Sequence, residues 1–221
     1  MSFQLPNAEA YIFDFNGTLF WDSKENREAW TDTFSKYRGR ALSDEEFLLL
    51  NGRTDRETVL YLDPKADEEK ISEISVYKEK LYKELCTSHK LTLSPGAEEL
   101  LASLKTRGKK LAIASSAPKM NMDWYIPEYG LERFFRREHI IAGRDDIPSK
   151  PDPAIFLLAR EALKAERENM IIFEDSASGV KAALDSGVKL VIRIKEEGLE
   201  NIQNPRVVEI QSFSELLIEE R

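Results

Sequence analysis

The chain has 221 residues, 42% of them hydrophobic, and its 10 glycines and 9 prolines are typical of a globular protein, which excludes a disordered, collagen-like or low-complexity chain. The formal net charge of −8 repels nucleic-acid phosphates and anionic lipid surfaces, so we expect neither nucleic acid nor a membrane as a partner. One cysteine cannot form an internal disulfide, and the first residues lack a signal-peptide pattern, so we expect a cytoplasmic protein.

Short apolar runs predict buried strands. In chain order they cover residues 10–13, 110–114, 170–173 and 188–192, with further short strands expected at 139–142 and 207–210. Helical patterns fall at residues 97–105, 118–125, 153–164 and 178–185. Strands that alternate with helices predict an α/β fold, a Rossmann-like parallel sheet with both faces covered.

The segment after the first strand shows helical periodicity without a convincing apolar strand. Asp22 with Glu25, and Ser43 with Glu46, fit the pattern in which a capping side chain is followed three residues later by an acid. The first helix is expected to stop at Gly39. We therefore predict an α-helical domain of residues 21–93, inserted into a core domain of residues 1–20 and 94–221.

Polar residues follow the predicted strands at the edge of the sheet where α/β proteins bind ligands. They are Asp14, Asn16, Gly17, Thr18, Ser115, Ser116, Glu174 and Asp175, with Lys150 in a loop before a helix. Asp14 and Asp175 meet across adjacent strand ends in this prediction. Their hard carboxylate oxygens suit Mg²⁺ better than Zn²⁺, so we expect Mg²⁺ as the cofactor.

The same residues predict a pocket for a phosphoryl group. The turn at Gly17 and Thr18 has backbone N–H groups that can point at an anion. Ser115 adds a hydroxyl donor, and Lys150 adds a positive charge. Phosphoryl transfer needs mainly positioning and charge neutralisation, and a carboxylate such as Asp14 can act as the nucleophile through an aspartyl-phosphate.

Four segments, taken together, resemble the signature motifs of the haloacid dehalogenase-like hydrolase superfamily, in its β-phosphoglucomutase and sugar-phosphate phosphatase branch. They are residues 12–19, 113–116, 150–156 and 173–180, and the resemblance covers essentially the whole chain. It implies that Asp14 is the nucleophile, and that the helical insert is a cap that closes over the site and excludes water. The implied phosphate ligands are Ser115 and Lys150, beside Gly17, Thr18 and Ser116. The implied Mg²⁺ ligands are Asp14, the main-chain carbonyl of Asn16, and Asp175, supported by Glu174.

Asn16 departs from the family pattern, in which a second aspartate two residues after the nucleophile acts as general acid and base. An amide cannot do this, and the loss is worth about 10²–10⁴ in rate. The enzyme then acts on substrates with good leaving groups, or is slow with proton transfer through water, or has become a binding protein. Deamidation of the Asn16–Gly17 dipeptide and an engineered substitution are further alternatives.

Residues of the predicted helical domain indicate which substrates the site could accept. Relative to the β-phosphoglucomutase pattern, Asn51 stands in place of a substrate-binding lysine and Asp55 in place of an arginine, which disfavours a mutase. Arg53 or Arg56 reaches a second anionic group, or is a solvated arginine at a helix end. Trp21 lines the substrate slot, or belongs to ordinary hinge packing.

The leading expectation is an Mg²⁺-dependent phosphatase that acts on a small phosphorylated metabolite through an aspartyl-phosphate. A β-phosphoglucomutase-type phosphotransferase is the alternative enzyme. A catalytically weak phosphate- or metabolite-binding module is the alternative from another class. The sequence leaves the substrate and the oligomeric state open, because specificity depends on the shape and closure of the cap.

Overall fold

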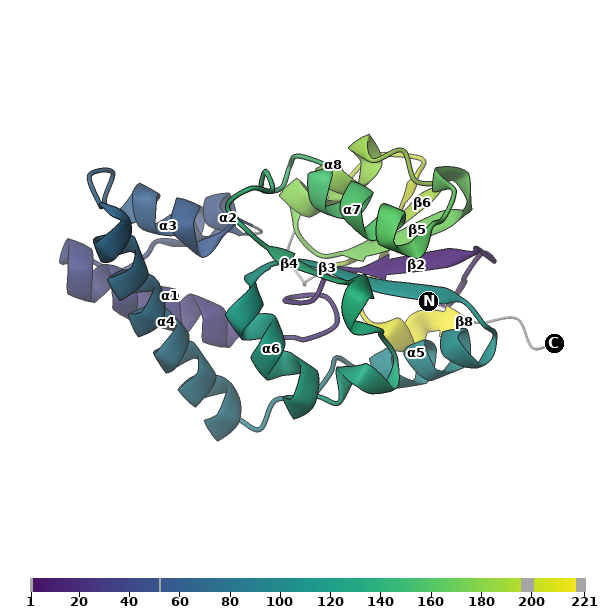
Figure 1. The fold of residues 1–221 in the computed structure, drawn as a ribbon, viewed down its shortest axis with the longest axis horizontal. Helices are drawn as coiled ribbons and strands as arrows, with labels where there is room; N and C mark the ends of the chain where they lie inside the picture. Colours follow the sequence, from purple (N-terminus) through teal and green to yellow (C-terminus); the bar gives the residue numbers. More distant parts are fainter. Residues whose placement is uncertain (1, 52, 196–200, 218–221) are drawn as a thin grey trace.

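A parallel β-sheet forms the centre of the computed structural model, which describes residues 2–51, 53–195 and 201–217 (Figure 1). Within these residues the sheet has the strand order β4-β3-β2-β5-β6-β7. The strands are β2 (Ala10–Phe13), β3 (Lys110–Pro118), β4 (Ile140–Gly143), β5 (Met170–Glu174), β6 (Leu190–Ile194) and β7 (Val207–Ile210). A separate small sheet pairs β1 (Phe3–Gln4) with β8 (Leu216–Leu217). The strand predictions are confirmed.

Helices cover both faces of the large sheet (Figure 1). Tyr11 and Phe13 on β2 belong to the apolar cluster that includes α5 (Ala97–Thr106) and α6 (Lys119–Glu128). The alternate residue Ile12 belongs to the cluster of α7 (Ala154–Leu163) and α8 (Ala177–Asp185). Successive side chains of a strand point to opposite faces, so β2 is apolar throughout because both faces are buried. The 3₁₀ turns are η1 (Leu131–Arg133), η2 (Arg137–His139), η3 (Arg167–Asn169) and η4 (Phe213–Glu215).

Strand register brings the chemically important residues to one edge of the sheet. Phe13 pairs with Ile113 on β3 and with Phe173 on β5. Asp14 and Glu174, which come next, therefore lie beside each other at the carboxyl ends of these strands. β3 continues to Pro118, four residues beyond the predicted end, because Pro118 pairs with Gly143 after an irregularity in register that follows Ala114.

A helical layer lies beyond this edge, at the left of Figure 1. It consists of α1 (Ser23–Arg38), α2 (Asp44–Leu50), α3 (Asp55–Leu62) and α4 (Glu68–Ser88), and is called the cap below. It has its own apolar cluster, which includes Trp30, Phe34 and Val59. The predicted capping box of Ser43 and Glu46 is confirmed, as is the end of α1 at Gly39, which has a φ of 76°.

The helix-start prediction at Asp22 is wrong in one respect. Asp22 does precede α1, but its side chain makes no capping hydrogen bond. The carboxylate is instead buried and turned toward the sheet edge, where it takes part in the site described next. Among the described residues, no helix is long and apolar enough to cross a membrane.

Candidate active site

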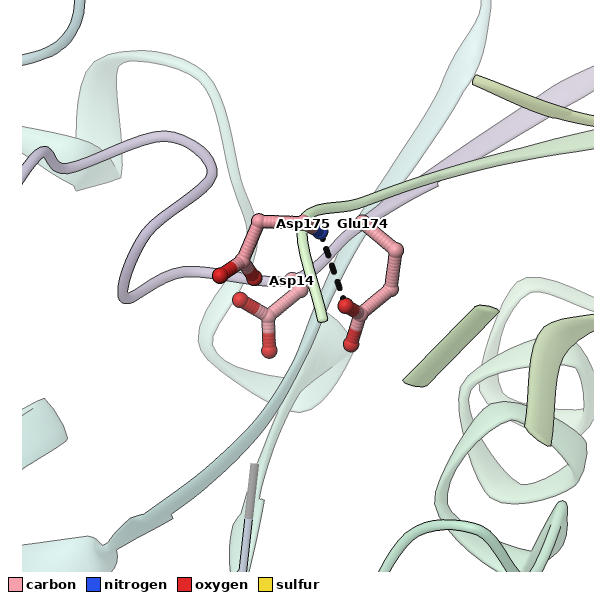
Figure 2. A group of neighbouring side chains, drawn as sticks. All are labelled: Asp14, Glu174 and Asp175. Atoms are coloured by element: carbon pink, nitrogen blue, oxygen red, sulfur yellow. Dashed lines mark hydrogen bonds between the residues drawn. The ribbon is translucent and has the colours of Figure 1, made fainter. Parts of the chain in front are cut away.

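Three carboxylates gather at the carboxyl ends of β2 and β5 (Figure 2). Asp14, Glu174 and Asp175 each offer one oxygen, and these oxygens all lie within 4.8 Å of one another. The carboxylates of Asp14 and Asp175 lie side by side in Figure 2, and that of Glu174 lies to one side of them. Glu174 Oε2 accepts hydrogen bonds from the backbone N–H groups of Asp175 (2.8 Å) and Ser176 (2.9 Å), which fix its orientation.

Lys150 is the buried counter-charge of this cluster. Its Nζ lies 2.6 Å from Asp14 Oδ1 and 2.5 Å from Glu174 Oε1. Burial alone would lower the pKa of Lys150, but the two carboxylates raise it above its ordinary value. Burial raises the pKa of Asp14, against the effect of Lys150, and burial together with the neighbouring carboxylates raises the pKa of Asp175. Three carboxyl groups thus face one ammonium group, and a bound cation would favour the ionised forms of Asp14 and Asp175.

The donor set fits Mg²⁺. Carboxylate and carbonyl oxygens are the hard ligands that this ion prefers. Since Glu174 is held by Lys150 and two backbone N–H groups, the residues that would contact the ion directly are Asp14 and Asp175. The main-chain carbonyl of Asn16 follows Asp14 by two residues and completes the protein ligands that the family resemblance implies.

Two glycines leave room for these carboxylates. A Cβ atom at Gly17 would lie 2.4 Å from Asp175 Oδ2, and Gly17 has a φ of +78° that other residues rarely adopt. A Cβ atom at Gly179 would lie 1.8 Å from Glu174 Oε1. The glycines of the first and last sequence motifs therefore have a steric reason to be there.

The turn at Gly17 differs from the prediction. The Gly17 N–H donates to the carbonyl of Phe20 (2.8 Å) and to Asp22 Oδ1 (3.0 Å), and the Thr18 N–H donates to the carbonyl of Phe15 (3.2 Å). Both N–H groups are used within the turn, so the expectation that they point at an anion is wrong for this structure. The hydroxyl of Thr18 instead donates to Asp175 Oδ1 (3.3 Å), so the turn supports the acidic cluster.

Asn16 is held by a buried polar network. Its Nδ2 lies 2.7 Å from Asp22 Oδ2, 3.0 Å from the Tyr125 hydroxyl and 3.2 Å from the Tyr82 hydroxyl. Its Oδ1 accepts from the Ser115 hydroxyl at 3.4 Å. The Asn16 amide thus donates a hydrogen bond to the buried Asp22 carboxylate. An ionised aspartate at position 16 has no hydrogen to donate and could not make this contact.

Asp22 is the residue of this network that the sequence analysis missed. Asp22 is 1% exposed, its carboxylate also accepts from the Tyr82 hydroxyl, and burial raises its pKa. The spacing of Asp22 and Glu25 fits a capping box, but neither side chain caps the helix. Glu25 Oε1 instead lies 2.7 Å from His89 Nδ1. No spacing pattern in the sequence predicts the contacts of Asp22 with Tyr82 and Asn16.

A cavity opens between the sheet edge and the cap. On the core side its lining includes Asp14, Asn16, Ser115, Ser116 and Asp175, and on the cap side it includes Trp30, Asn51, Arg53, Asp55, Lys78, Glu79 and Tyr82. The cap contacts the core directly, since the Ser149 hydroxyl donates to Glu57 Oε1 (2.6 Å) and the Ser178 hydroxyl donates to the Asn51 carbonyl (3.1 Å).

Of the remaining predicted specificity residues, Arg56 and Trp21 lie outside the cavity and Arg53 lines it. Arg56 is paired with Glu68 at 2.6 Å and faces a neighbouring cavity, so it is not brought to the site. Trp21 is 41% exposed and does not belong to the lining of the cavity. Arg53 lines the cavity, but it also donates to the Leu49 carbonyl (3.3 Å).

An α/β sheet with a helical cap, and an acidic cluster paired with a buried lysine at the sheet edge, fit an enzyme of the phosphoryl-transfer type. The sequence model described as "Haloacid dehalogenase-like hydrolase" matches residues 11–192, and the chain belongs to this family. A phosphorylated carbohydrates phosphatase from Thermotoga maritima is 31% identical over 185 residues, which cover 83% of each chain.

Solved structures agree with this assignment. A family IA, variant 3 hydrolase of the same superfamily from Entamoeba histolytica has a TM-score of 0.84 and 33% identity, with 95% of each chain covered. A mutant of CbbY from Rhodobacter sphaeroides, in complex with xylulose-(1,5)bisphosphate, has a TM-score of 0.80 and 26% identity, with 96% of this chain and 97% of that chain covered. The predicted family and fold class are confirmed. The chain is a hydrolase, and its phosphatase relatives support a phosphoric monoester hydrolase.

Proposed function

We propose that the chain is an Mg²⁺-dependent phosphatase that hydrolyses a small phosphorylated metabolite of the sugar-phosphate class, through an aspartyl-phosphate on Asp14. One observation carries the proposal: Asp14, Glu174 and Asp175 line a cavity between the sheet edge and the cap, and buried Lys150 bridges Asp14 and Glu174 behind them. The relatives named as phosphatases of phosphorylated carbohydrates and of validoxylamine A 7'-phosphate support it.

The reaction has two displacements at phosphorus. A carboxylate oxygen of Asp14 attacks, the bond between phosphorus and the ester oxygen breaks, and the departing oxygen takes a proton. Water then attacks the phosphorus of the aspartyl-phosphate, releases inorganic phosphate and restores the carboxylate. Lys150 and Ser115 position the phosphoryl group, and Mg²⁺, when bound, neutralises charge on the transferred phosphoryl oxygens.

Asn16 sets the leaving-group preference in this proposal. Its amide is held by Asp22 at 2.7 Å and is too weak an acid to protonate a departing alkoxide. Substrates whose leaving group needs little protonation therefore react faster, and others depend on water for the proton. Asn51 and Asp55, which stand on the cap where the mutase pattern has a lysine and an arginine, favour a phosphatase over a phosphotransferase.

Turnover of p-nitrophenyl phosphate with and without Mg²⁺ tests the proposal, with Asp14→Asn as the control. We expect Mg²⁺-dependent turnover that Asp14→Asn abolishes. If the unmodified chain and Asp14→Asn give equal rates while both bind phosphate, the chain is a binding module and the proposal is wrong.

A further inference from the structure

One charged side chain interrupts the apolar run of β6. Val191, Ile192 and Ile194 are buried in the two apolar clusters of the core, and Arg193 among them is only 4% exposed. Burying a guanidinium group costs free energy unless the group is paired, and an apolar residue would fit a buried strand at lower cost. The presence of Arg193 in this strand therefore needs a reason beyond packing.

Strand register places Arg193 between two acidic residues. It pairs with Glu174 on β5 and with Glu209 on β7, and residues in register on neighbouring parallel strands point to the same face of the sheet. Arg193 Nη1 lies 2.9 Å from Glu209 Oε1, which also accepts from the Ile202 N–H (3.0 Å). Glu209 thus balances the charge of the guanidinium group and fixes its orientation.

A second nitrogen of the guanidinium group reaches the acidic cluster. Arg193 Nε donates to the main-chain carbonyl of Asp175 at 3.0 Å. Ser176 is the N-cap of α8, and its carbonyl accepts a helical hydrogen bond from the Val180 N–H (2.9 Å). The Asp175 carbonyl lies one residue before this cap, so its donor comes from a neighbouring strand and not from the helix.

Asp175 is therefore held at three points. Its N–H donates to Glu174 Oε2 (2.8 Å), its Oδ1 accepts from the Thr18 hydroxyl (3.3 Å), and its carbonyl accepts from Arg193. The two main-chain contacts fix the peptide groups on either side of the Asp175 Cα atom, and these set the direction in which the side chain leaves the main chain. The carboxylate so directed lies beside that of Asp14 (Figure 2).

We propose that Arg193 is a positioning residue for the Mg²⁺ site, and that it holds the Asp175 carboxylate where it binds the ion together with Asp14. The inference rests on the Mg²⁺ of the proposed function and deepens it, since Arg193 lies outside the four sequence motifs. Residues that orient metal ligands are typically worth about 10–100-fold in metal affinity.

The charge of Arg193 acts in the opposite direction to its hydrogen bond. A positive charge near a cation site repels Mg²⁺, so loss of the charge alone would tighten binding. Loss of the hydrogen bond to Asp175 would let this ligand move and weaken binding. A purely structural residue would change the free energy of unfolding and leave the affinity unchanged. The sign of the change in Mg²⁺ affinity therefore distinguishes the three roles.

The test measures the dissociation constant of Mg²⁺ by isothermal titration calorimetry on the metal-free protein, without substrate. The main variant combines Arg193→Met with Glu209→Met, which removes the ion pair without changing the net charge and puts apolar side chains in its place. We expect the dissociation constant to rise about tenfold or more. With p-nitrophenyl phosphate, the Mg²⁺ concentration that gives half the maximal rate should rise by the same factor, and kcat at saturating Mg²⁺ should change much less.

Arg206→Met is the matched control. Arg206 also donates to main-chain carbonyls, those of Leu184 (3.3 Å) and Val188 (3.2 Å), but it precedes β7 at the opposite edge of the sheet. Its loss should leave the dissociation constant of Mg²⁺ unchanged. Thermal unfolding midpoints show whether each variant is folded.

Arg193→Lys takes the place of the double variant if that variant does not fold. It keeps the positive charge beside Glu209, but one ammonium nitrogen cannot hold both Glu209 and the Asp175 carbonyl in the geometry of the guanidinium fork. The dissociation constant of Mg²⁺ should again rise, although the charge is retained.

A folded variant that binds Mg²⁺ as tightly as Arg206→Met, or more tightly than the unmodified chain, would overturn the inference. Turnover of p-nitrophenyl phosphate that depends on Asp14 and Mg²⁺ would then leave the proposed function intact. Failure of the proposed function looks different, because the unmodified chain itself then binds no Mg²⁺ or hydrolyses p-nitrophenyl phosphate no faster than Asp14→Asn. Absence of Mg²⁺ binding by the unmodified chain would refute both.

Discussion

Replacing Asn16 with aspartate tests how the chain manages without the usual acid. In the present structure Asn16 Nδ2 lies 2.7 Å from Asp22 Oδ2, in a buried network. Asn16→Asp would place two carboxyl groups at this distance. Two buried carboxylates so close cannot both ionise, so the pair keeps one proton near neutral pH and restores a general acid beside the phosphoryl group.

The magnitude follows from these contacts. General acid catalysis is worth about 10²–10⁴ in rate, or roughly 3–5 kcal/mol, for an alkyl phosphate whose leaving group needs a proton. An aryl phosphate needs less help and should gain little.

Loss of the hydrogen bond from the Asn16 amide to Asp22 costs about 1.5–3 kcal/mol of stability. Since the folded pair holds a proton that the unfolded chain releases, the stability loss should grow as the pH rises.

The assay is turnover of methyl phosphate and of p-nitrophenyl phosphate by the unmodified chain and by Asn16→Asp, with urea unfolding at low and high pH. Asn26→Asp is the matched control, because it adds the same charge to a residue that lines the same cavity. An intact mass of the unmodified protein shows whether Asn16 has deamidated. An unchanged methyl phosphate rate in a folded Asn16→Asp would refute the reasoning, because residue 16 would then never have limited the reaction.

Three further predictions concern the charges of the site. Lys150→Met leaves two buried carboxylates unpaired and should destabilise the metal-free protein by about 3–5 kcal/mol in urea unfolding, with part of the loss recovered in Mg²⁺; an unaltered midpoint would contradict this. Mg²⁺ should raise the unfolding temperature of the unmodified chain, and EDTA should abolish turnover; turnover that persists in EDTA would argue against a metal site. Burial raises the pKa of Asp55, so the folded state holds an extra proton between about pH 4 and 7, and the stability of the unmodified chain relative to Asp55→Asn should fall as the pH rises, on the order of 1 kcal/mol per pH unit. A difference that is constant with pH would show that Asp55 titrates normally.

Features with a local cause were predictable from the sequence. The apolar run on β2 indicated a strand because both of its faces are buried, and Ser43 with Glu46 indicated a helix start because the capping contacts span three residues. The convergence of Asp14 and Asp175 followed from neighbouring parallel strands, since such strands end at one edge of the sheet.

Features that depend on distant contacts were not predictable. Asn16 contacts Tyr125, which is 109 positions away, and Asp22 contacts Tyr82, which is 60 positions away, so no spacing rule applies. The direction of the Gly17 N–H was missed because the turn closes on the Phe20 carbonyl, which depends on the backbone path and not on residue type. The grouping of Lys78 and Glu79 with Asn121 at one cavity likewise depends on how the helices of the cap meet α6.

Covalent trapping tests the central claim, attack by Asp14 on phosphorus, most directly. The protein is mixed with Mg²⁺ and p-nitrophenyl phosphate, quenched in acid within one turnover, digested and analysed by mass spectrometry. We predict one phosphoryl group on Asp14 that hydroxylamine removes, as expected for an acyl phosphate, and no such adduct in Asp14→Asn. A phosphoryl group on another residue, or full turnover by Asp14→Asn, would contradict the claim.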